Sequence, residues 1–150
     1  MNADEYVARY DLGDVIDAAP LGDCRLAFRH QRGTGDLWCV AIGPLATIAI
    51  PLLPGDALAR ADRRAGQGAR ARYAKWPRVR IDDDLLIAFR SRGSELEFEY
   101  LFGDGAPFGG GGGWLPTPRQ ATLLERVQMW LSGRRGGHVE FARRTDEGGR

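Results

Sequence analysis

Hydrophobic and polar residues alternate from residue 85 to residue 102, which is the pattern of two half-buried antiparallel strands. With a turn at residues 92–93, the apolar side chains of the two strands face each other in pairs: Leu85 with Tyr100, Ile87 with Phe98, and Phe89 with Leu96. The other face places Arg90 opposite Glu95 and also carries Glu97 and Glu99. Covering each large apolar side chain contributes roughly 1.5–3 kcal/mol, so this hairpin requires a cover.

An amphipathic helix at residues 118–132 is the predicted cover. Thr117 as N-cap, Pro118 at the first helical position and Gln120 form a capping box, and Gly133 ends the helix. Its apolar residues recur at helical spacing: Leu123, Leu124, Val127, Trp130 and Leu131. The expected fold class is therefore α+β, a mostly antiparallel sheet of about five to six strands covered on one face by this C-terminal helix.

Other segments add strands to this sheet. Residues 24–31 alternate as a strand, residues 32–36 form a turn cluster, and residues 37–42 and 46–50 are apolar on both faces, as central strands are. We expect a short strand and then a helical turn within residues 5–18, a short helix at 57–64 capped by Asp56, and a last strand at 138–142. Residues 69–81 fit either an irregular segment or an edge strand, because Pro77 prevents a helix across them.

The length of 150 residues and a hydrophobic content of 43% predict a single domain with one core. Residues 1–4 and 143–150 are expected to fray, and residues 103–113, with consecutive glycines at 109–113, are expected to form a flexible loop. Cys24 and Cys39 do not face each other in the predicted hairpin. With no signal peptide and prolines throughout the uncharged stretch 37–55, we expect reduced thiols, no membrane span and a cytoplasmic protein.

The chain lacks a convincing catalytic constellation. It contains two histidines, His30 at the expected core edge and His138 at a strand start, and Cys39 is expected to be a buried structural thiol. The cysteines and histidines do not have the paired spacing of a zinc site. The glycine run lacks the lysine and Ser/Thr of a phosphate loop. We therefore expect no enzyme activity, no metal and no cofactor.

Charge is segregated into blocks although the net charge is only +1. The basic block at residues 57–80 has interleaved aromatics, and its candidate nucleic-acid contacts are Arg70, Arg72, Tyr73, Trp76, Arg78 and Arg80. The neighbouring acids would repel phosphates, so nucleic-acid binding is an alternative function and not the first choice. A small adaptor domain for protein interactions is a further alternative. The acidic block, with an aromatic residue of the loop, supplies the candidate partner-binding set: Asp82, Asp83, Asp84, Glu95, Glu97, Glu99 and Phe108.

The C-terminal third carries a family resemblance. Its order is Phe98-Glu99-Tyr100, then Gly103, then Leu115-Pro116 opening a helix that ends at Trp130-Leu131-Ser132-Gly133, then Val139-Glu140-Phe141. This order resembles the end of the immunity proteins of bacterial polymorphic toxin systems, including those that act against deaminase toxins. The resemblance implies a non-enzymatic protein that binds a cognate toxin and occludes its active site. Toxins that act on nucleic acid have basic clefts, so the acidic set is the surface expected to face that partner.

Overall fold

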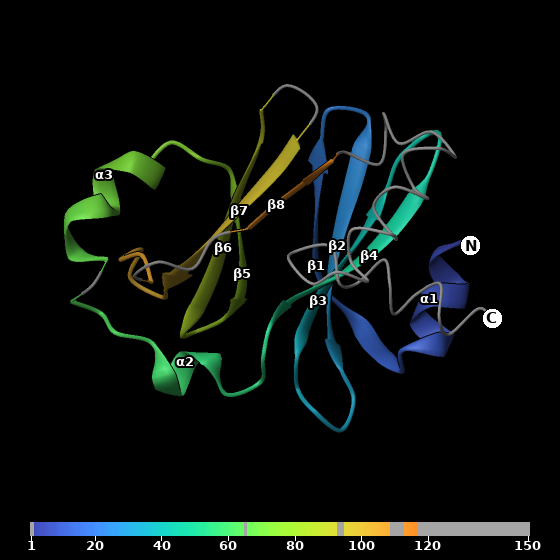
Figure 1. Ribbon diagram of the computed structural model, residues 1–150, viewed down its shortest axis with the longest axis horizontal. Helices are drawn as coiled ribbons and strands as arrows, with labels where there is room; N and C mark the ends of the chain where they lie inside the picture. Colours follow the sequence, from blue (N-terminus) through green and yellow to red (C-terminus); the bar gives the residue numbers. More distant parts are fainter. Residues whose placement is uncertain (1, 65, 93–94, 109–112, 117–150) are drawn as a thin grey trace, which may run out of the picture.

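The computed structural model describes residues 2–64, 66–92, 95–108 and 113–116. Strands β1 to β4 form one antiparallel sheet and strands β5 to β8 form another, each in sequence order (Figure 1). The elements in chain order are α1 (Ala3–Arg9), β1 (Leu12–Leu21), β2 (Cys24–Gln31), β3 (Leu37–Ile42), β4 (Thr47–Leu53), α2 (Ala57–Arg60), the 3-10 helix η1 (Gln67–Ala69), α3 (Arg70–Tyr73), β5 (Arg78–Asp82), β6 (Leu85–Arg92), β7 (Glu95–Phe102) and β8 (Gly113–Pro116).

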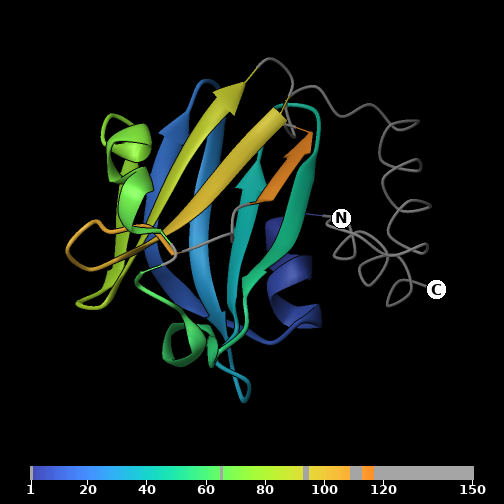
Figure 2. The ribbon, with the colours of Figure 1, turned by 60° about the vertical axis from the view of Figure 1, so that its left-hand side comes forward.

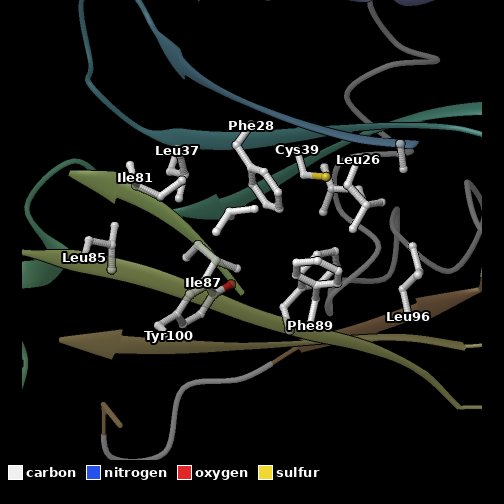
Figure 3. Close-up of a cluster of buried hydrophobic side chains, with 14 of the residues drawn as sticks. Leu26, Phe28, Leu37, Cys39, Ile81, Leu85, Ile87, Phe89, Leu96 and Tyr100 are labelled. Atoms are coloured by element: carbon white, nitrogen blue, oxygen red, sulfur yellow. The ribbon is translucent and has the colours of Figure 1, made fainter. Parts of the chain in front are cut away.

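The inner faces of the two sheets share the main hydrophobic core (Figure 3). Phe28 of the first sheet and Phe89 of the second meet with ring centroids 6.5 Å apart. The Tyr100 hydroxyl donates a hydrogen bond of 3.0 Å to the carbonyl oxygen of Leu52. Because each sheet presents its period-two apolar positions to the other, the fold is a two-layer sandwich of antiparallel sheets.

Short helical segments cover parts of both outer faces (Figure 2). On the first sheet, Tyr6 of α1 belongs to a buried cluster with Leu12, Trp38, Val40 and Ala49. On the second sheet, Tyr73 and Trp76 pack on a buried cluster of Leu86, Ala88 and Leu101. The central strands are therefore buried on both faces, which explains the burial of β3 from Leu37 to Ala41.

The sequence correctly predicts a mostly antiparallel sheet architecture and several of its strands. Strands β2 and β3 have the expected bounds. Of the two alternatives for residues 69–81, the edge strand is found only after Pro77, as β5 beside β6, and the short helix α3 lies before it. Strand β4 begins and ends later than predicted and is an edge strand of its sheet, which accommodates Pro51 within it. The predicted single sheet was wrong, since the strands form two four-stranded sheets. Alternation of apolar and polar residues shows which face of a strand is buried but not which element covers that face.

The hairpin of β6 and β7 has the predicted inner face but a different register. Ile87 pairs with Tyr100 and Phe89 with Phe98, two residues away from the predicted pairing. A shift of two residues preserves the side-chain faces, so all six predicted apolar residues remain in the core. The first sheet covers this face. The predicted covering helix at 118–132 and the strand at 138–142 lie outside the described residues.

The N-terminal prediction was wrong in its order. Helix α1 comes first and the long strand β1 follows it. Asn2 caps the helix by accepting from the Glu5 N–H at 2.9 Å, and the Glu5 side chain accepts from the Asn2 N–H. Residues 2–4 are thus part of a capped helical start, contrary to the expected fraying.

The described part of the predicted flexible loop packs onto the sheet. Phe108 is buried, and its ring centroid lies 4.6 Å from that of Phe102. The Phe108 N–H donates to the Tyr100 carbonyl at 2.8 Å, and the Gly105 N–H donates to the Phe102 carbonyl at 2.8 Å. Phe108 is therefore a core residue, and its prediction as an exposed partner contact was wrong.

Both cysteines are free thiols and Cys39 is buried, as predicted, and Cys24 is buried as well. Cys24 pairs across strands with Leu21, and Cys39 pairs with Phe28. Burial raises the pKa of the Cys39 thiol, which keeps it protonated at neutral pH. Among the described helices, none has the length and apolar character needed to cross a bilayer.

The inter-sheet core generates a stability prediction. Phe89→Ala removes a ring that is 2% exposed between the sheets, so it should lower the free energy of unfolding by about 3–5 kcal/mol. Equilibrium urea denaturation measures this loss. The matched control is Leu45→Ala at a side chain that is 66% exposed, for which we expect a change of about 0.5 kcal/mol or less. Equal losses in the two variants would contradict the assignment of Phe89 to the core.

Candidate functional site

The three consecutive aspartates form the turn between β5 and β6. Arg80 holds this turn by donating to the carbonyl oxygens of Asp82 at 3.2 Å and Asp83 at 3.3 Å. It also donates to the Gly103 carbonyl at 3.0 Å, and the Asp84 N–H donates to the Asp82 carboxylate at 2.8 Å. A Cβ on Gly103 would lie 2.0 Å from the Asp83 carbonyl oxygen, so the two turns are in close contact. The backbone of the acidic turn is therefore restrained by the Arg80 side chain and by close contact with Gly103.

The carboxylates of Asp83 and Asp84 take no part in these restraints, which use only the backbone atoms of the two residues. Both residues are exposed. Within the described part of the chain, neither carboxylate takes part in a hydrogen bond or an ion pair. The turn therefore combines a restrained backbone with two charges that remain available to a partner.

The glutamates of the predicted acidic set do not join this turn. Glu95 and Glu97 lie at the opposite end of the hairpin, and the length of β6 at ~3.3 Å per residue separates them from the aspartates by roughly 20 Å. Glu97 is neutralised by Arg90 at 3.2 Å and Arg92 at 3.8 Å. The structure therefore separates the six acids, and only the aspartates form an exposed cluster.

Glu99 is buried on the outer face of the second sheet, under Tyr73. Its exposed fraction is 7%, and burial raises the pKa of its carboxyl group above the ordinary value. A hydrogen bond from the Tyr73 hydroxyl, the N–H of Tyr100 and the charge of Arg72 each oppose that rise in pKa. A buried carboxylate of this kind is a structural group that is costly to ionise.

Three of the four predicted nucleic-acid arginines bind the protein's own backbone. Arg78 donates to the carbonyl oxygens of Tyr73 at 2.6 Å and Ala74 at 3.2 Å, at the end of α3. Arg70 donates to the Asp104 carbonyl at 2.8 Å, and Arg80 holds the acidic turn. Arg72 is exposed, with its guanidinium carbon 5.9 Å from the Tyr73 ring centroid.

The two aromatics of the basic block also have structural partners. Tyr73 and Trp76 meet edge to face, with ring centroids 4.9 Å apart, and pack on the second sheet. The guanidinium of Arg90 lies 4.4 Å from the Trp76 ring centroid. Both rings are therefore engaged by protein groups, an arrangement that disfavours stacking on the bases of a nucleic-acid strand.

A surface pocket lies between the segment that precedes α3 and the loop after β7. Its volume is about 370 Å³, and it is lined by Arg63, Arg64, Gln67, Arg70 and Ala106. In the sequence these arginines are visible only as part of a charge block. Their meeting depends on Asp104, which is distant in sequence and contacts both Arg63 and Arg70.

Asp104 organises this pocket. Its carboxylate accepts from Arg63 at 2.7 Å and forms an ion pair with Arg70 at 3.8 Å. Its other oxygen accepts from the Ala106 N–H at 3.1 Å. This backbone bond, together with the neighbouring arginines, lowers the pKa of Asp104, so the group is charged at neutral pH.

The remaining chemical candidates do not converge. His30 is exposed near the end of β2, two residues beyond the buried Phe28, and its Nδ1 lies 3.2 Å from the Gly35 carbonyl oxygen. Within the described ranges, no group of three or more His, Cys, Asp or Glu side chains is placed to hold a metal ion.

Comparison of the chain with protein-family models, with curated proteins and with solved structures finds no match.

The buried Glu99 generates a pH prediction. Its folded-state pKa lies above the ordinary 4.5, so the folded state binds more protons than the unfolded state as pH rises past 4.5. The free energy of unfolding therefore falls as pH rises from 4.5 through the folded-state pKa of Glu99. Glu99→Gln removes this titration, so its stability relative to the parent should increase from pH 4 to pH 7 in urea denaturation. Tyr73→Phe is the comparison variant: it keeps the carboxyl group and removes a hydrogen bond that lowers its pKa, so the loss of stability with rising pH should persist in this variant. A pH-independent difference for Glu99→Gln would contradict the assignment.

Proposed function

We propose that this chain is a non-enzymatic binding protein that presents the acidic turn Asp82–Asp84 to a basic surface of a protein partner. The resemblance of its C-terminal third suggests the biological form of this activity. In that form the partner is a bacterial toxin, possessing a basic, nucleic-acid-directed active site that the bound chain covers.

The observation that carries the proposal is the restrained backbone of the turn. Three donated hydrogen bonds from Arg80 and the close approach of Gly103 hold the aspartates in place before a partner arrives. A preorganised surface loses little conformational entropy on binding. Charges held in this way contribute to selection between partners.

The alternatives receive less support from the arrangement of side chains. An arginine-rich nucleic-acid surface would need exposed rings and unoccupied guanidinium groups, whereas Tyr73, Trp76, Arg78 and Arg80 are engaged within the protein. An adaptor domain would use the same acidic turn with a different partner, so the identity of the partner separates these two readings.

The first experiment identifies the partner and tests the turn. We would coexpress the chain with the product of the neighbouring gene and measure complex formation by size-exclusion chromatography and by titration calorimetry. We expect a one-to-one complex. Asp83→Lys should weaken that complex by about tenfold or more, because it places a positive charge against a basic partner surface. The effect should shrink as salt is raised from 50 to about 500 mM.

The matched control is Asp4→Lys. Asp4 is an exposed acid in the first turn of α1, which packs on the other sheet, and its substitution makes the same change in net charge. Its affinity should stay within about twofold of the parent. Equal weakening by Asp4→Lys and Asp83→Lys would show a net-charge effect and would overturn the assignment of the turn. Absence of a complex with the neighbouring product would overturn the toxin form of the proposal.

A further inference from the structure

We infer that the pocket lined by Arg63, Arg64, Gln67 and Arg70 is a binding site for the phosphate group of a small phosphorylated molecule. This inference is independent of the acidic turn and of the proposed protein partner. It rests on the charge of the pocket, on its restrained walls and on its size.

The charge of the pocket is unbalanced. Three guanidinium groups line it, and a single carboxylate, that of Asp104, contacts two of them. Arg64 makes neither a hydrogen bond nor an ion pair through its guanidinium within the described residues. Guanidinium groups bind phosphate through paired N–H donors, and each has more donors than Asp104 can engage. The pocket therefore retains donors and net positive charge for an incoming anion.

The walls of the pocket are held before a ligand arrives. Gly66 is buried against the loop after β7, where an added Cβ would lie 2.1 Å from the Pro107 carbonyl oxygen. Arg70 donates to the Asp104 carbonyl at 2.8 Å, which ties α3 to the same loop. The guanidinium carbon of Arg63 lies 4.3 Å from the Phe102 ring centroid. These contacts restrict two of the three arginines, so less side-chain entropy is lost when they engage an anion.

The size and surroundings of the pocket indicate the class of ligand. A volume of about 370 Å³ lies in the range of small-molecule sites, and it exceeds the space that a single phosphate ion fills. The nearby rings offer no stacking platform for successive bases, because Phe102 lies under Arg63 and packs on Phe108, and Tyr73 and Trp76 pack on the sheet. A compact phosphate ester or diphosphate therefore fits better than a nucleic-acid strand.

The test uses the full chain and four probes: inorganic phosphate, inorganic pyrophosphate, ADP and single-stranded oligonucleotides of increasing length. Titration calorimetry at about 50 mM salt should show saturable one-to-one binding of pyrophosphate or ADP. Arg64→Gln should weaken that binding by about tenfold, because it removes one charge-assisted donor group from the pocket. Lys75→Gln is the matched control, since it removes one positive charge from an exposed side chain outside the pocket and should leave the affinity within about twofold.

The outcomes separate the sources of the anion. Tighter binding of ADP than of pyrophosphate supports a phosphorylated organic ligand, and equal binding supports recognition of the phosphate groups alone. Three results would overturn the inference: no saturable binding of any probe, equal weakening by Arg64→Gln and Lys75→Gln, or binding of a single-stranded oligonucleotide that tightens with its length and displaces ADP. Because the acidic turn is unchanged in Arg64→Gln, complex formation with the protein partner reports separately on the proposed function.

Discussion

Burial of apolar side chains between the two sheets is the constraint on which the rest of the structure depends. Phe28, Phe89 and Tyr100 lie at this contact, and the Tyr100 hydroxyl satisfies a carbonyl of β4 within it. A two-stranded hairpin is at best marginally stable alone, so β6 and β7 depend on the opposing sheet. Once their inner face is covered, the connections at the strand ends are fixed in space. The acidic turn is one such connection, and the arginine pocket forms where the long segment between β4 and β5 meets the loop after β7.

The outer face of the second sheet explains why the basic block does not form a simple charged surface. Leu86, Ala88 and Leu101 make that face apolar, and it is covered by Tyr73 and Trp76. The two aromatic rings are thus packed against the sheet, and Arg78 donates a hydrogen bond to a carbonyl at the end of α3. What remains for recognition is the part of the block that extends beyond the sheet, where Arg63, Arg64 and Arg70 meet the loop after β7.

Local pattern predicted the strands well and the long-range contacts poorly. Strands β2 and β3 were found because turn residues bound their apolar runs, and the faces of the hairpin were found because alternation survives a two-residue shift. Helix α1 was missed although Asn2 and Glu5 carry the capping-box spacing. The acidic set was placed on one surface because strand parity cannot show that Glu99 is covered or that Glu97 is paired. The pocket depends on Asp104, whose contacts with Arg63 and Arg70 span many residues of chain, so no local pattern could indicate it.

The near-neutral net charge limits how these two surfaces can act. A chain with a net charge of +1 has little long-range field to steer a partner. At physiological ionic strength, the fields of the acidic turn and of the arginine pocket fade over ~8 Å. The two surfaces also adjoin. Arg80 of the acidic turn donates to the carbonyl of Gly103, and Arg70 of the pocket donates to the carbonyl of the following residue, Asp104. Beyond that distance the negative charge of the turn and the positive charge of the pocket offset each other. Recognition must therefore come from hydrogen bonds and ion pairs made in direct contact with the partner or ligand. Selectivity then depends on how firmly each group is held, which is why the bonds that restrain residues 103 and 104 matter to both surfaces.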